Sequence, residues 1–388
     1  MNSLIVFSHL RWNFVYQRPQ HLLTRMALRC PVVYIEEPVT GAATDELEII
    51  DAAPGVEVWR PHVRRTEPGM AAVHTPVLQR LVKAAIRQKR ILSYWLWFYT
   101  PMAVPVASGL DPDGIVYDCM DELSLFRGAP PDLLVHEATL LRNADVVFTG
   151  GRSLYNAKRA QRPSVHCFPS SVDALHFRPG VTEHAQQARL PRPRLGYCGV
   201  IDERIDLGLV AGIASARPEW SIVMVGPTAK IDPASLPRAP NLHWLGQQRY
   251  EDLPAFIAGW DICLLPFALN DATRFISPTK TLEYMACAKP AVSTAIKDVV
   301  EPYGHVVPIR ADVAGFVEAC ENFLGRNAAA RAAHERMLAE IVAGTSWDAT
   351  AASMYDLIVK SAPATVTSPR RLAVPEASRA VTASAAAN

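Results

Sequence analysis

Short apolar runs alternate with amphipathic helical stretches along most of the chain, and this alternation limits the fold more than any other feature. Strands that are covered by helices on both faces of a parallel sheet read as continuous apolar runs. In the first half, strands are expected at 4–10, 32–36, 56–61, 91–99, 115–118, 146–149 and 165–169. In the second half, they are expected at 195–200, 222–225, 242–245, 262–267, 291–294 and 306–309. The pattern therefore predicts an α/β protein with two doubly wound, Rossmann-like domains.

Helical stretches fill the gaps between these strands, and proline opens several of them, as its fixed φ allows in a first turn. In the first half, helices are expected to begin near Pro19, Pro76, Pro101, Pro131 and Ser153. In the second half, they are expected at 206–216, 250–260, 278–288 and 313–324, followed by two more at 327–343 and 347–360.

Domain boundaries follow from composition. A chain of 388 residues is long enough for two domains. Residues 178–193 contain three prolines and no apolar period, which is typical of a linker. We therefore expect a first domain at 1–177, a second at 194–345 and a further helix at 346–361. Residues 362–388 contain nine alanines, three prolines and no aromatic residue, so we expect a disordered tail.

Charge and cysteine content exclude several classes of protein. Lysine plus arginine exceed the acidic residues by one, and no basic stripe carries aromatic residues, so nucleic acid is not an expected partner. The seven cysteines are scattered and form no CxxC pair, which argues against a zinc site. The chain begins directly with an apolar strand and shows no export signal, so we expect a cytoplasmic location.

One segment is ambiguous between a buried strand and a membrane span. Residues 91–110 carry no charge over twenty positions, which is nominally long enough to cross a bilayer. Two prolines divide the segment, and we therefore favour a buried strand followed by a helix that starts near Pro101.

Familiar nucleotide motifs are absent. No GxGxxG follows the first strand and no GxxxxGK[ST] occurs in the chain, so neither a dinucleotide fingerprint nor a P-loop explains the domains. Asp111-Pro112-Asp113 precedes a strand and is interpreted as a loop. Asp118, Asp121 and Glu122 lie at the carboxyl end of a predicted parallel strand, where such sheets bind ligands, so they form either a site or a solvated loop.

The most informative stretch begins at Ser277-Pro278-Thr279-Lys280 and continues to Glu283. Serine is a good N-cap and proline fits the first turn, so the backbone N–H groups from Ser277 to Lys280 should present a positive end to an anion. A lysine in the first turn opposes the helix dipole, and a bound phosphate would resolve this conflict. Glu283 lies on the same helical side and can accept from hydroxyls. The alternative is a solvated i,i+3 salt bridge on a surface helix.

Several segments resemble, in order, the retaining nucleotide-sugar glycosyltransferases of the GT-B fold, in particular the family 4 group. The matching segments are RWNFVYQRPQHLL, HCFPSSVDALHFRP, GYCGVIDERIDLGLV, VMVGP, NLHWLGQQRYEDLPAFIAGWDICLLPF and SPTKTLEYMACAKPAVS. The first of these is similar to a subset that includes teichuronic-acid and other cell-surface polysaccharide transferases. The resemblance covers about residues 1–360 and implies an active site in the cleft between the domains, with the last helix crossing back to the first domain.

The resemblance also implies roles for individual residues. Glu283 would hold the ribose diol, and we expect its carboxylate to be partly solvated without ligand. Gly199 and Arg204, the latter in place of the usual lysine, would face the diphosphate. The full expected nucleotide-sugar set is Gly199, Arg204, Gln247, Tyr250, Ser277, Pro278, Thr279, Lys280 and Glu283, and the expected acceptor-side set is Arg18, Gln20 and His21.

Two departures from the family pattern affect the reaction. The acidic residue eight positions before the ribose glutamate is replaced by Phe275, so Asp271 or Arg274 would face the donor sugar. The usual Gly-Gly loop after the first strand is replaced by His9-Leu10-Arg11-Trp12.

The reaction implied is transfer of a sugar from a nucleoside diphosphate sugar to an acceptor hydroxyl, without metal or cofactor. With retention, the leaving phosphate accepts the acceptor proton, and no pair of catalytic carboxylates is needed. Inversion would instead need a base, for which His9 or Asp118 is suitably placed. The first-domain catalytic candidates are therefore Asp118, Asp121 and His9.

Two other classes of function remain open from the sequence. A nucleotide-sugar epimerase of the same fold would need no acceptor, and a non-catalytic two-domain protein would only bind the nucleotide sugar. We expect a saccharide or lipid-linked acceptor. Residues 68–110 contain no acid, and Arg80, Lys83, Arg87 and Arg90 share a helical face opposite Leu78, Leu81, Val82 and Ile86. This face predicts peripheral contact with anionic membrane at the inner face of the cell membrane, or else a solvated basic surface.

Overall fold

The computed structural model describes residues 2–361 and Leu372. It divides into two compact units: Met1–Phe168 with Thr350–Asn388, and Pro169–Ala349. The predicted disordered tail lies outside the described residues except for Leu372, which is buried.

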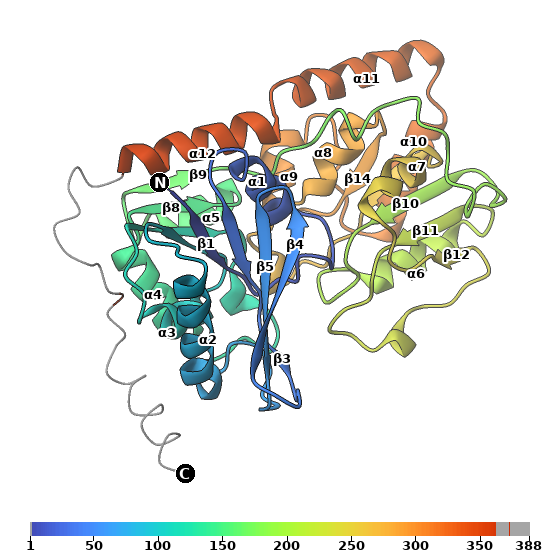
Figure 1. Ribbon diagram of the computed structural model, residues 1–388. Coiled ribbons are helices and arrows are strands. Elements are labelled where there is room, and N and C mark those ends of the chain that lie inside the picture. The colour runs from blue at the N-terminus through green and yellow to red at the C-terminus, as the bar shows by residue number, and fades with distance from the viewer. Residues whose placement is uncertain (1, 362–371, 373–388) are drawn as a thin grey trace. The chain divides into compact units, whose positions relative to one another are not determined.

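The first unit is built on one sheet in the strand order β3-β5-β2-β1-β6-β7-β8-β9 (Figure 1). Every neighbouring pair in this order is parallel. The strands are β1 (Leu4–Phe7), β2 (Val32–Ile35), β3 (Val39–Thr40), β4 (Glu46–Ala53), β5 (Val56–Val63), β6 (Trp95–Phe98), β7 (Gly114–Cys119), β8 (Val146–Thr149) and β9 (Val165–Cys167). All seven strands predicted for this half are present, most of them shorter than expected.

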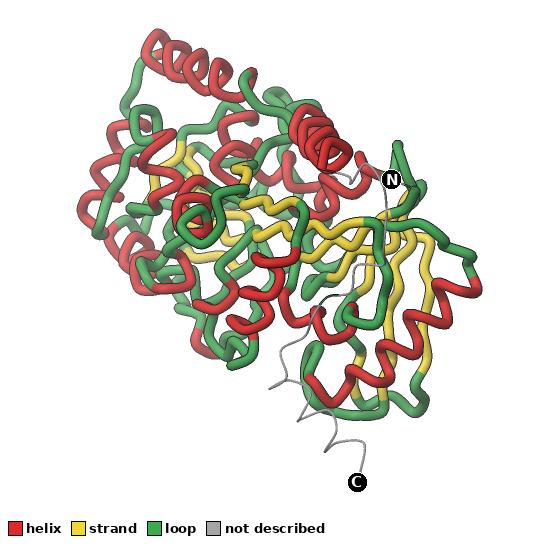
Figure 2. Tube along the Cα trace, turned by 90° about the vertical axis from the view of Figure 1, so that its left-hand side faces the viewer, coloured by secondary structure: helices red, strands yellow, loops and turns green. Residues whose placement is uncertain are grey.

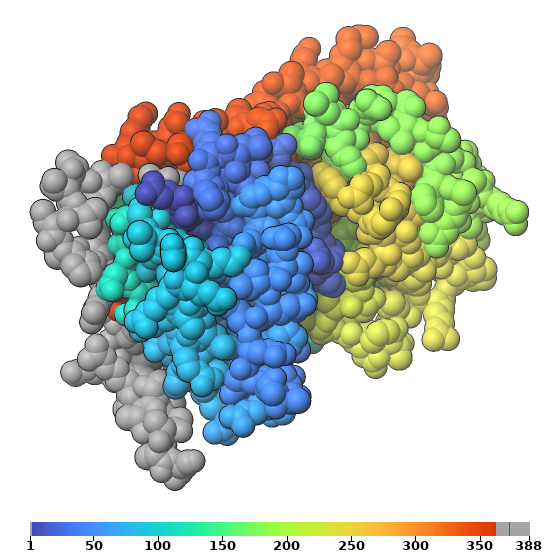
Figure 3. Space-filling model, viewed as in Figure 1, coloured from blue at the N-terminus to red at the C-terminus, as the bar shows by residue number. Residues whose placement is uncertain are grey.

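Strands β3 and β4 were not predicted. β4 pairs with β5 in the antiparallel direction, in the register Glu46↔His62 to Ala53↔Val56. Its side chains are exposed or half-buried throughout, so it lacks the apolar run that marks the other strands. Figure 3 shows the blue segment that contains β4 at the surface of the molecule. β4 therefore adds to the predicted parallel sheet an antiparallel strand that the apolar pattern does not mark.

Helices flank the strands of the first sheet (Figure 2). They are α1 (Arg18–Met26), α2 (Thr75–Gln88), α3 (Val104–Ala107), α4 (Leu133–Asn143) and α5 (Arg152–Lys158). The segment 91–110 folds as β6 and α3 with a short 3₁₀ turn between them. No helix within the described ranges is long and apolar enough to cross a membrane.

The second unit contains a five-stranded parallel sheet in the order β12-β11-β10-β13-β14. Its strands are β10 (Arg194–Cys198), β11 (Ser221–Val225), β12 (Leu242–Trp244), β13 (Ile262–Leu265) and β14 (Ala291–Ser293). Its helices are α6 (Leu207–Ala216), α7 (Leu253–Ala258), α8 (Thr279–Ala286), α9 (Lys297–Tyr303), α10 (Val313–Leu324) and α11 (Ala328–Ala343). Helix α9 was not predicted, and the strand expected at 306–309 is only a single bridge between Ser293 and Ile309.

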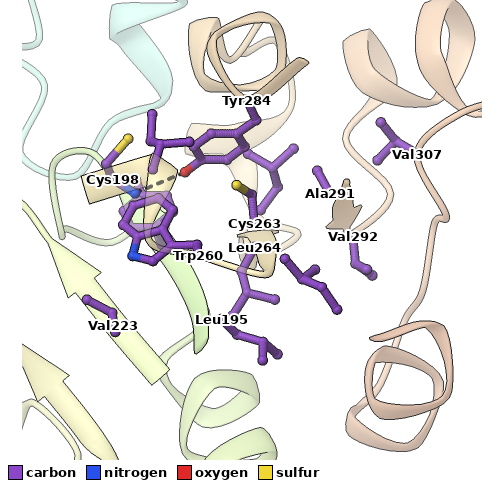
Figure 4. Close-up of a cluster of buried hydrophobic side chains, with 14 of the residues drawn as sticks. Leu195, Cys198, Val223, Trp260, Cys263, Leu264, Tyr284, Ala291, Val292 and Val307 are labelled. Atoms are coloured by element: carbon purple, nitrogen blue, oxygen red, sulfur yellow. Dashed lines mark hydrogen bonds between the residues drawn. The ribbon is translucent and has the colours of Figure 1, made fainter. Parts of the chain in front are cut away.

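A tight contact in the second core explains one glycine in β10. A Cβ atom at Gly196 would lie 1.9 Å from the ring of Trp260, which is fully buried. Only glycine leaves room for this ring against the strand. Figure 4 shows Trp260 packed beside Cys198 and Tyr284 among the buried side chains.

The predicted linker 178–193 is part of the second unit. Val172 and Phe177 are buried in its core. The side chain of Gln187 is fully buried, accepts from Trp260 Nε1 at 2.9 Å and donates to Phe256 O at 2.7 Å. The boundary therefore falls at Phe168 rather than residue 177, because polar and proline-rich segments can still be anchored by a few buried side chains.

Helix α12 (Trp347–Ser361) is divided between the units, and its residues from Thr350 onward group with the first. Ala351, Met354 and Ile358 are buried along one side of the helix. The guanidinium of Arg29 lies 4.5 Å from the ring centroid of Tyr355.

Candidate active site

In the first unit, two polar side chains, those of Tyr34 and Glu36, fix the loop that follows β1. Tyr34 Oη donates to Ser8 Oγ at 2.7 Å and to Leu10 O at 3.0 Å. The fully buried carboxylate of Glu36 accepts from Trp12 N at 2.8 Å. This loop carries His9, whose side chain is half-buried at the carboxyl end of the strand. His9 therefore keeps the position expected of a group facing a ligand.

Asp118 is placed differently from what a catalytic base requires. Its two carboxylate oxygens accept from Arg18 at 3.1 Å (Nε) and 2.9 Å (Nη2), and Arg18 also donates to Phe168 O at 2.7 Å. Arg18 and Asp118 are 4% and 0% exposed. Burial lowers the pKa of Arg18, but the charge and hydrogen bond of Asp118 outweigh it and raise the pKa. Arg18 and Asp118 are therefore committed to each other in the core, and the acceptor role of Arg18 and the catalytic role of Asp118 stay predictions.

The other two predicted acceptor residues are also buried. Gln20 Nε2 donates to Trp12 O at 2.6 Å and to Val15 O at 3.1 Å, which fixes the loop before α1. His21 is buried and its ring packs edge-on against Tyr16 at 4.7 Å. The first turn of α1 thus packs inward, and the acceptor-side roles of Gln20 and His21 stay predictions.

Asp121 follows β7 and is half-buried. The neighbouring Glu122 pairs with the buried ammonium of Lys158 at 2.7 Å, and Lys158 also pairs with Glu137 at 2.7 Å. Of the first-unit catalytic candidates, His9 and Asp121 remain within reach of solvent.

In the second unit, α8 is attached to the carboxyl end of β10. The backbone N–H of Cys198 donates to Tyr284 Oη at 2.9 Å, as Figure 4 shows. Burial raises the pKa of the Cys198 thiol to about 12, while the nearby Lys280 acts in the opposite direction. The first turns of α8 therefore lie at the edge of the sheet where open α/β folds bind ligands.

The helix begins one residue later than expected. Its first residue is Thr279 and its N-cap is Pro278, with no side-chain cap. Ser277 does not cap the helix; its carbonyl oxygen accepts from Ser170 Oγ at 2.9 Å. Pro278 and Thr279 are half-buried. The N-terminal turn, which includes Lys280, still offers the backbone N–H groups that every helix leaves unpaired at its start.

Lys280 and Glu283 form an ion pair on α8. Lys280 Nζ lies 2.9 Å from Glu283 Oε2, and the two side chains are 16% and 4% exposed. Burial lowers the pKa of Lys280, but the charge and hydrogen bond of Glu283 together with the nearby Cys198 outweigh burial and raise it. The i,i+3 bridge exists, but it is buried, so the expectation of a partly solvated Glu283 is wrong.

The loop after β10 approaches the same region. Gly199 has φ of +153°, and a Cβ atom there would lie 2.5 Å from Tyr197 Oη. Arg204 binds Asp202 through two guanidinium nitrogens, Nε to Oδ1 at 2.9 Å and Nη2 to Oδ2 at 2.7 Å. Tyr197 lies within the electrostatic influence of Arg204, Asp202 and Glu283, and burial raises its pKa. The structure thus brings the glycine loop and α8 together.

Gln247 and Tyr250, two members of the expected nucleotide-sugar set, differ in exposure. Gln247 is exposed after β12. The ring of Tyr250 stacks on His176 at 4.3 Å, and Tyr250 O lies 3.0 Å from His176 Nε2. Tyr250 is therefore at least partly committed to anchoring the segment that precedes β10.

Sequence reasoning missed three polar residues, two that shape these loops and one on α8. Glu36 organises the His9 loop, and its position directly after β2 was the available signal. Asp202 fixes Arg204 and stands two residues before it in the matched segment. Thr281 Oγ1 is buried beside Lys280 and has no hydrogen-bond partner among the described residues. No pattern marks such a group in a sequence.

Within residues 2–361 and Leu372, no three His, Cys, Asp or Glu side chains are grouped so that they could hold a metal ion. Phe275, at the position of the expected acid, is half-buried beneath the guanidinium of Arg274 at 5.4 Å, and Asp271 and Arg274 are exposed.

Comparison with known proteins adds to this geometry. Residues 192–326 match the family described as Glycosyl transferases group 1. The chain is 25% identical over 276 residues to TuaH of Bacillus subtilis (strain 168), whose name gives it as a teichuronic acid biosynthesis glycosyltransferase. That alignment covers 65% of this chain and 68% of TuaH.

Solved structures share the fold over nearly the whole length. A sucrose-phosphate synthase from Thermosynechococcus elongatus matches with a TM-score of 0.69 and 17% identity, covering 93% of this chain and 99% of that one. Anabaena HepE in complex with UDP and glucose matches with a TM-score of 0.68 and 12% identity, covering 93% and 100%. The family match and the shared fold confirm the predicted resemblance and identify the chain as a nucleotide-sugar glycosyltransferase of the GT-B fold.

Proposed function

We propose that this protein transfers a sugar, with retention, from a nucleoside diphosphate sugar to an acceptor in the synthesis of a cell-surface polysaccharide or glycolipid. The observation that carries the donor assignment is the buried Lys280–Glu283 pair on α8, beside the carboxyl end of β10. A cation and a carboxylate held together at a helix start suit a ligand that carries both phosphate and hydroxyl groups.

Lys280 is the group proposed to bind the diphosphate. Its raised pKa keeps the ammonium charged at neutral pH, and a cation in the first helical turn is unfavourable until an anion arrives. A phosphate oxygen would accept from Nζ and from the free N–H groups of the same turn. Donor binding would thus offset the unfavourable interaction between the Lys280 cation and the helix dipole.

Glu283 is the group proposed to bind the ribose. Only Lys280 donates to its carboxylate among the described residues, and through Oε2 alone. The other oxygen can accept from a ribose hydroxyl in a charge-assisted hydrogen bond. One carboxylate would then hold both the sugar and the lysine in place.

The loop at Gly199 supports this arrangement sterically. Gly199 lets Tyr197 Oη pack against the loop where a Cβ atom would lie only 2.5 Å away, and its φ of +153° sets the course of the loop beside α8. Arg204 beside it is held by Asp202, so it would contribute directed hydrogen bonds to a phosphate more than net charge.

The proposed chemistry follows from these groups. The bond from the anomeric carbon to the diphosphate breaks, the acceptor oxygen forms its bond on the same face, and the acceptor proton passes to the leaving phosphate. The α8 N-terminal turn and Lys280 stabilise the negative charge that develops on that phosphate. No pair of catalytic carboxylates is required for this route.

The first unit would bind the acceptor. His9 and Asp121 are the half-buried polar groups at the carboxyl ends of β1 and β7 that we propose for this role. The name of TuaH, which concerns teichuronic acid biosynthesis, favours an envelope saccharide or a lipid-linked saccharide as the acceptor class.

A panel of nucleoside diphosphates tests the donor assignment. A ligand present at 100 times its dissociation constant adds about 2.7 kcal/mol to the free energy of unfolding, so the correct nucleotide should raise the melting temperature clearly. UDP, GDP, ADP and the matching nucleosides would be compared by thermal melting and calorimetry. If no nucleotide binds, the proposal fails; if sugar turns over without an acceptor, an epimerase is favoured.

We further propose that the basic face of α2 rests on anionic membrane. On α2, Arg80 and Arg87 are exposed and Lys83 is half-buried. Arg90 was expected on the same helical face but lies two residues beyond the end of α2; it is exposed, and the neighbouring Leu92 is 92% exposed. The opposite face of the helix packs inward, as expected. Of the residues expected there, Leu81 is only half-buried, and Ala85, which was not expected there, is buried. Exposed cations beside an exposed leucine fit a negatively charged bilayer surface.

Co-sedimentation with vesicles tests this contact. The protein should pellet with vesicles containing anionic lipid at low salt, and the double variant R87Q/R90Q should pellet less. A charge-matched control in the second unit, R238Q/R336Q, should behave like the parent. Equal recovery with neutral vesicles, or equal loss in both double variants, would contradict the proposal.

A further inference from the structure

A polar pocket lies in the second unit at the amino ends of β13 and β14. Its volume is about 230 Å³, and its walls come from the residues just before these strands, the end of α10 and the first turns of α11. Because the proposed donor site lies at the carboxyl end of β10 and these strands are parallel, this pocket is at the opposite edge of the same sheet. It is thus separate from the donor site.

Two arginines give the pocket its charge. The guanidinium of Arg326 lies over the ring of Phe323 at 4.1 Å, and Arg331 Nη2 donates to Leu324 O at 3.0 Å. Neither arginine forms an ion pair with a carboxylate of the described residues. Each is therefore positioned by a contact that leaves other guanidinium N–H groups available.

The remaining charged groups of the pocket do not cancel this charge. Asp261 is already neutralised, because it accepts from Arg192 Nη1 at 2.5 Å and from Arg194 N at 2.7 Å. The ammonium of Lys289 donates to the carbonyl oxygens of Ala258 and Trp260 at 2.9 and 2.7 Å. Glu335 is the one further acid in the lining, and it is exposed.

A buried histidine completes the site. His334 is 9% exposed, lines the pocket, and its Nε2 has no hydrogen-bond partner among residues 2–361. Burial and the nearby Arg326 lower its pKa, so the imidazole is neutral at physiological pH and can donate from Nε2. A buried polar atom without a partner is costly, and a bound acceptor would satisfy it.

We propose that this pocket binds a small phosphate-bearing molecule through Arg326, Arg331 and His334. Two guanidinium groups and an imidazole donor match the several acceptor oxygens of a phosphate. The volume is below the about 300–1,000 Å³ of sites for drug-sized ligands, which limits the ligand to inorganic phosphate or a small phosphate ester. Helix α11 packs against α8, so a ligand here would contact the element that neighbours the proposed donor helix.

Calorimetric titration of the full chain tests the proposal at constant ionic strength. The probes are inorganic phosphate, glycerol 3-phosphate and glycerol. We expect inorganic phosphate, glycerol 3-phosphate or both to bind, and glycerol not to bind. The tighter of the two phosphate probes shows whether the ligand is free phosphate or a phosphate ester. R326Q and R331Q should each weaken binding about tenfold or more, and H334N should weaken it as well. E335Q should bind more tightly, because it removes a repelling charge.

Two controls locate the site. R336Q removes an exposed arginine of the same helix that does not line the pocket, and it should bind phosphate like the parent. K280M removes the cation of the proposed donor site, so phosphate binding that persists in K280M and is lost in R326Q belongs to this pocket. The melting temperature of each variant shows that it is folded. No binding to the parent protein, equal binding in R326Q and R331Q, or loss confined to K280M would each overturn the proposal.

Discussion

Each unit contains a buried ion pair near the carboxyl edge of its sheet, and the two pairs are built differently. In the first unit, Arg18 and Asp118 are 100 residues apart in sequence and share two hydrogen bonds, and Arg18 has a third bond to a backbone carbonyl. In the second unit, Lys280 and Glu283 are three residues apart on one helix and share a single hydrogen bond.

The difference indicates which pair can exchange partners. The Arg18–Asp118 pair joins α1 to β7 and uses both carboxylate oxygens, so opening it would separate two elements of the core. The Lys280–Glu283 pair joins no other element and leaves one carboxylate oxygen and two ammonium protons without protein partners among the described residues. We therefore assign the first pair to stability and the second to ligand binding.

The largest expected effect is on folding in the first unit. Arg18→Met leaves the Asp118 carboxylate buried without a counter-charge, so the free energy of unfolding should fall by about 3–5 kcal/mol. Chemical denaturation, followed by fluorescence, measures this loss.

A double variant sharpens this test. In Arg18→Met with Asp118→Leu, no charge is left unpaired, so most of the stability should return. If Arg18→Met is as stable as the parent, the Arg18–Asp118 pair does not stabilise the first unit, and its assignment to stability is wrong.

Lys280→Met should act on affinity rather than mainly on folding. Removing a charge-assisted hydrogen bond to phosphate costs about 1.5–3 kcal/mol, which is about 10- to 150-fold in the dissociation constant of a nucleoside diphosphate. Binding of the bare nucleoside should change little. Calorimetry with both ligands measures the difference, and equal weakening of the two would place Lys280 away from the diphosphate.

A smaller effect is expected from the buried thiols, four of which lie in the second unit and two in the first. Burial raises the pKa of Cys320 to about 12, from an ordinary value near 9. The unfolded thiol therefore loses its proton first as pH rises. This contribution to stability is complete below pH 9 and is lost between about pH 9 and 12, at up to about 1.4 kcal/mol per pH unit.

Cys320→Ala tests this dependence. The variant should lose stability less steeply than the parent between pH 9 and 10.5, whatever its stability at neutral pH. Denaturation curves at several pH values give the two slopes, and identical slopes would show that this thiol ionises equally in both states.

Sequence reasoning predicted the elements that periodicity marks. Strands buried on both faces, such as β1 and β8, stand out as apolar runs, whereas the exposed β4 shows none. The start of α8 was expected one residue early because Ser277 has the chemistry of a cap but uses its carbonyl for Ser170. Local pattern cannot show such a choice of partner.

The candidate site was predictable only in part, for a related reason. Lys280 and Glu283 are neighbours on one helix, so their spacing alone placed them together. Arg18 and Asp118 come from elements far apart in the chain, and nothing local shows that they neutralise each other. Burial was missed in both pairs, because it depends on what packs around them.

The most direct test of the central claim compares Glu283→Gln with the parent on two ligands. Glutamine keeps the shape of the side chain and an acceptor for Lys280 but loses the charge. The ligands are the nucleoside diphosphate that binds best and its 2′,3′-dideoxy analogue. Calorimetry should show about tenfold or greater weakening of the ribose-containing ligand in the variant, and little difference between the two proteins for the analogue. If Glu283→Gln binds the intact nucleotide as tightly as the parent does, Glu283 does not hold the ribose, and the pair on α8 is only a structural ion pair.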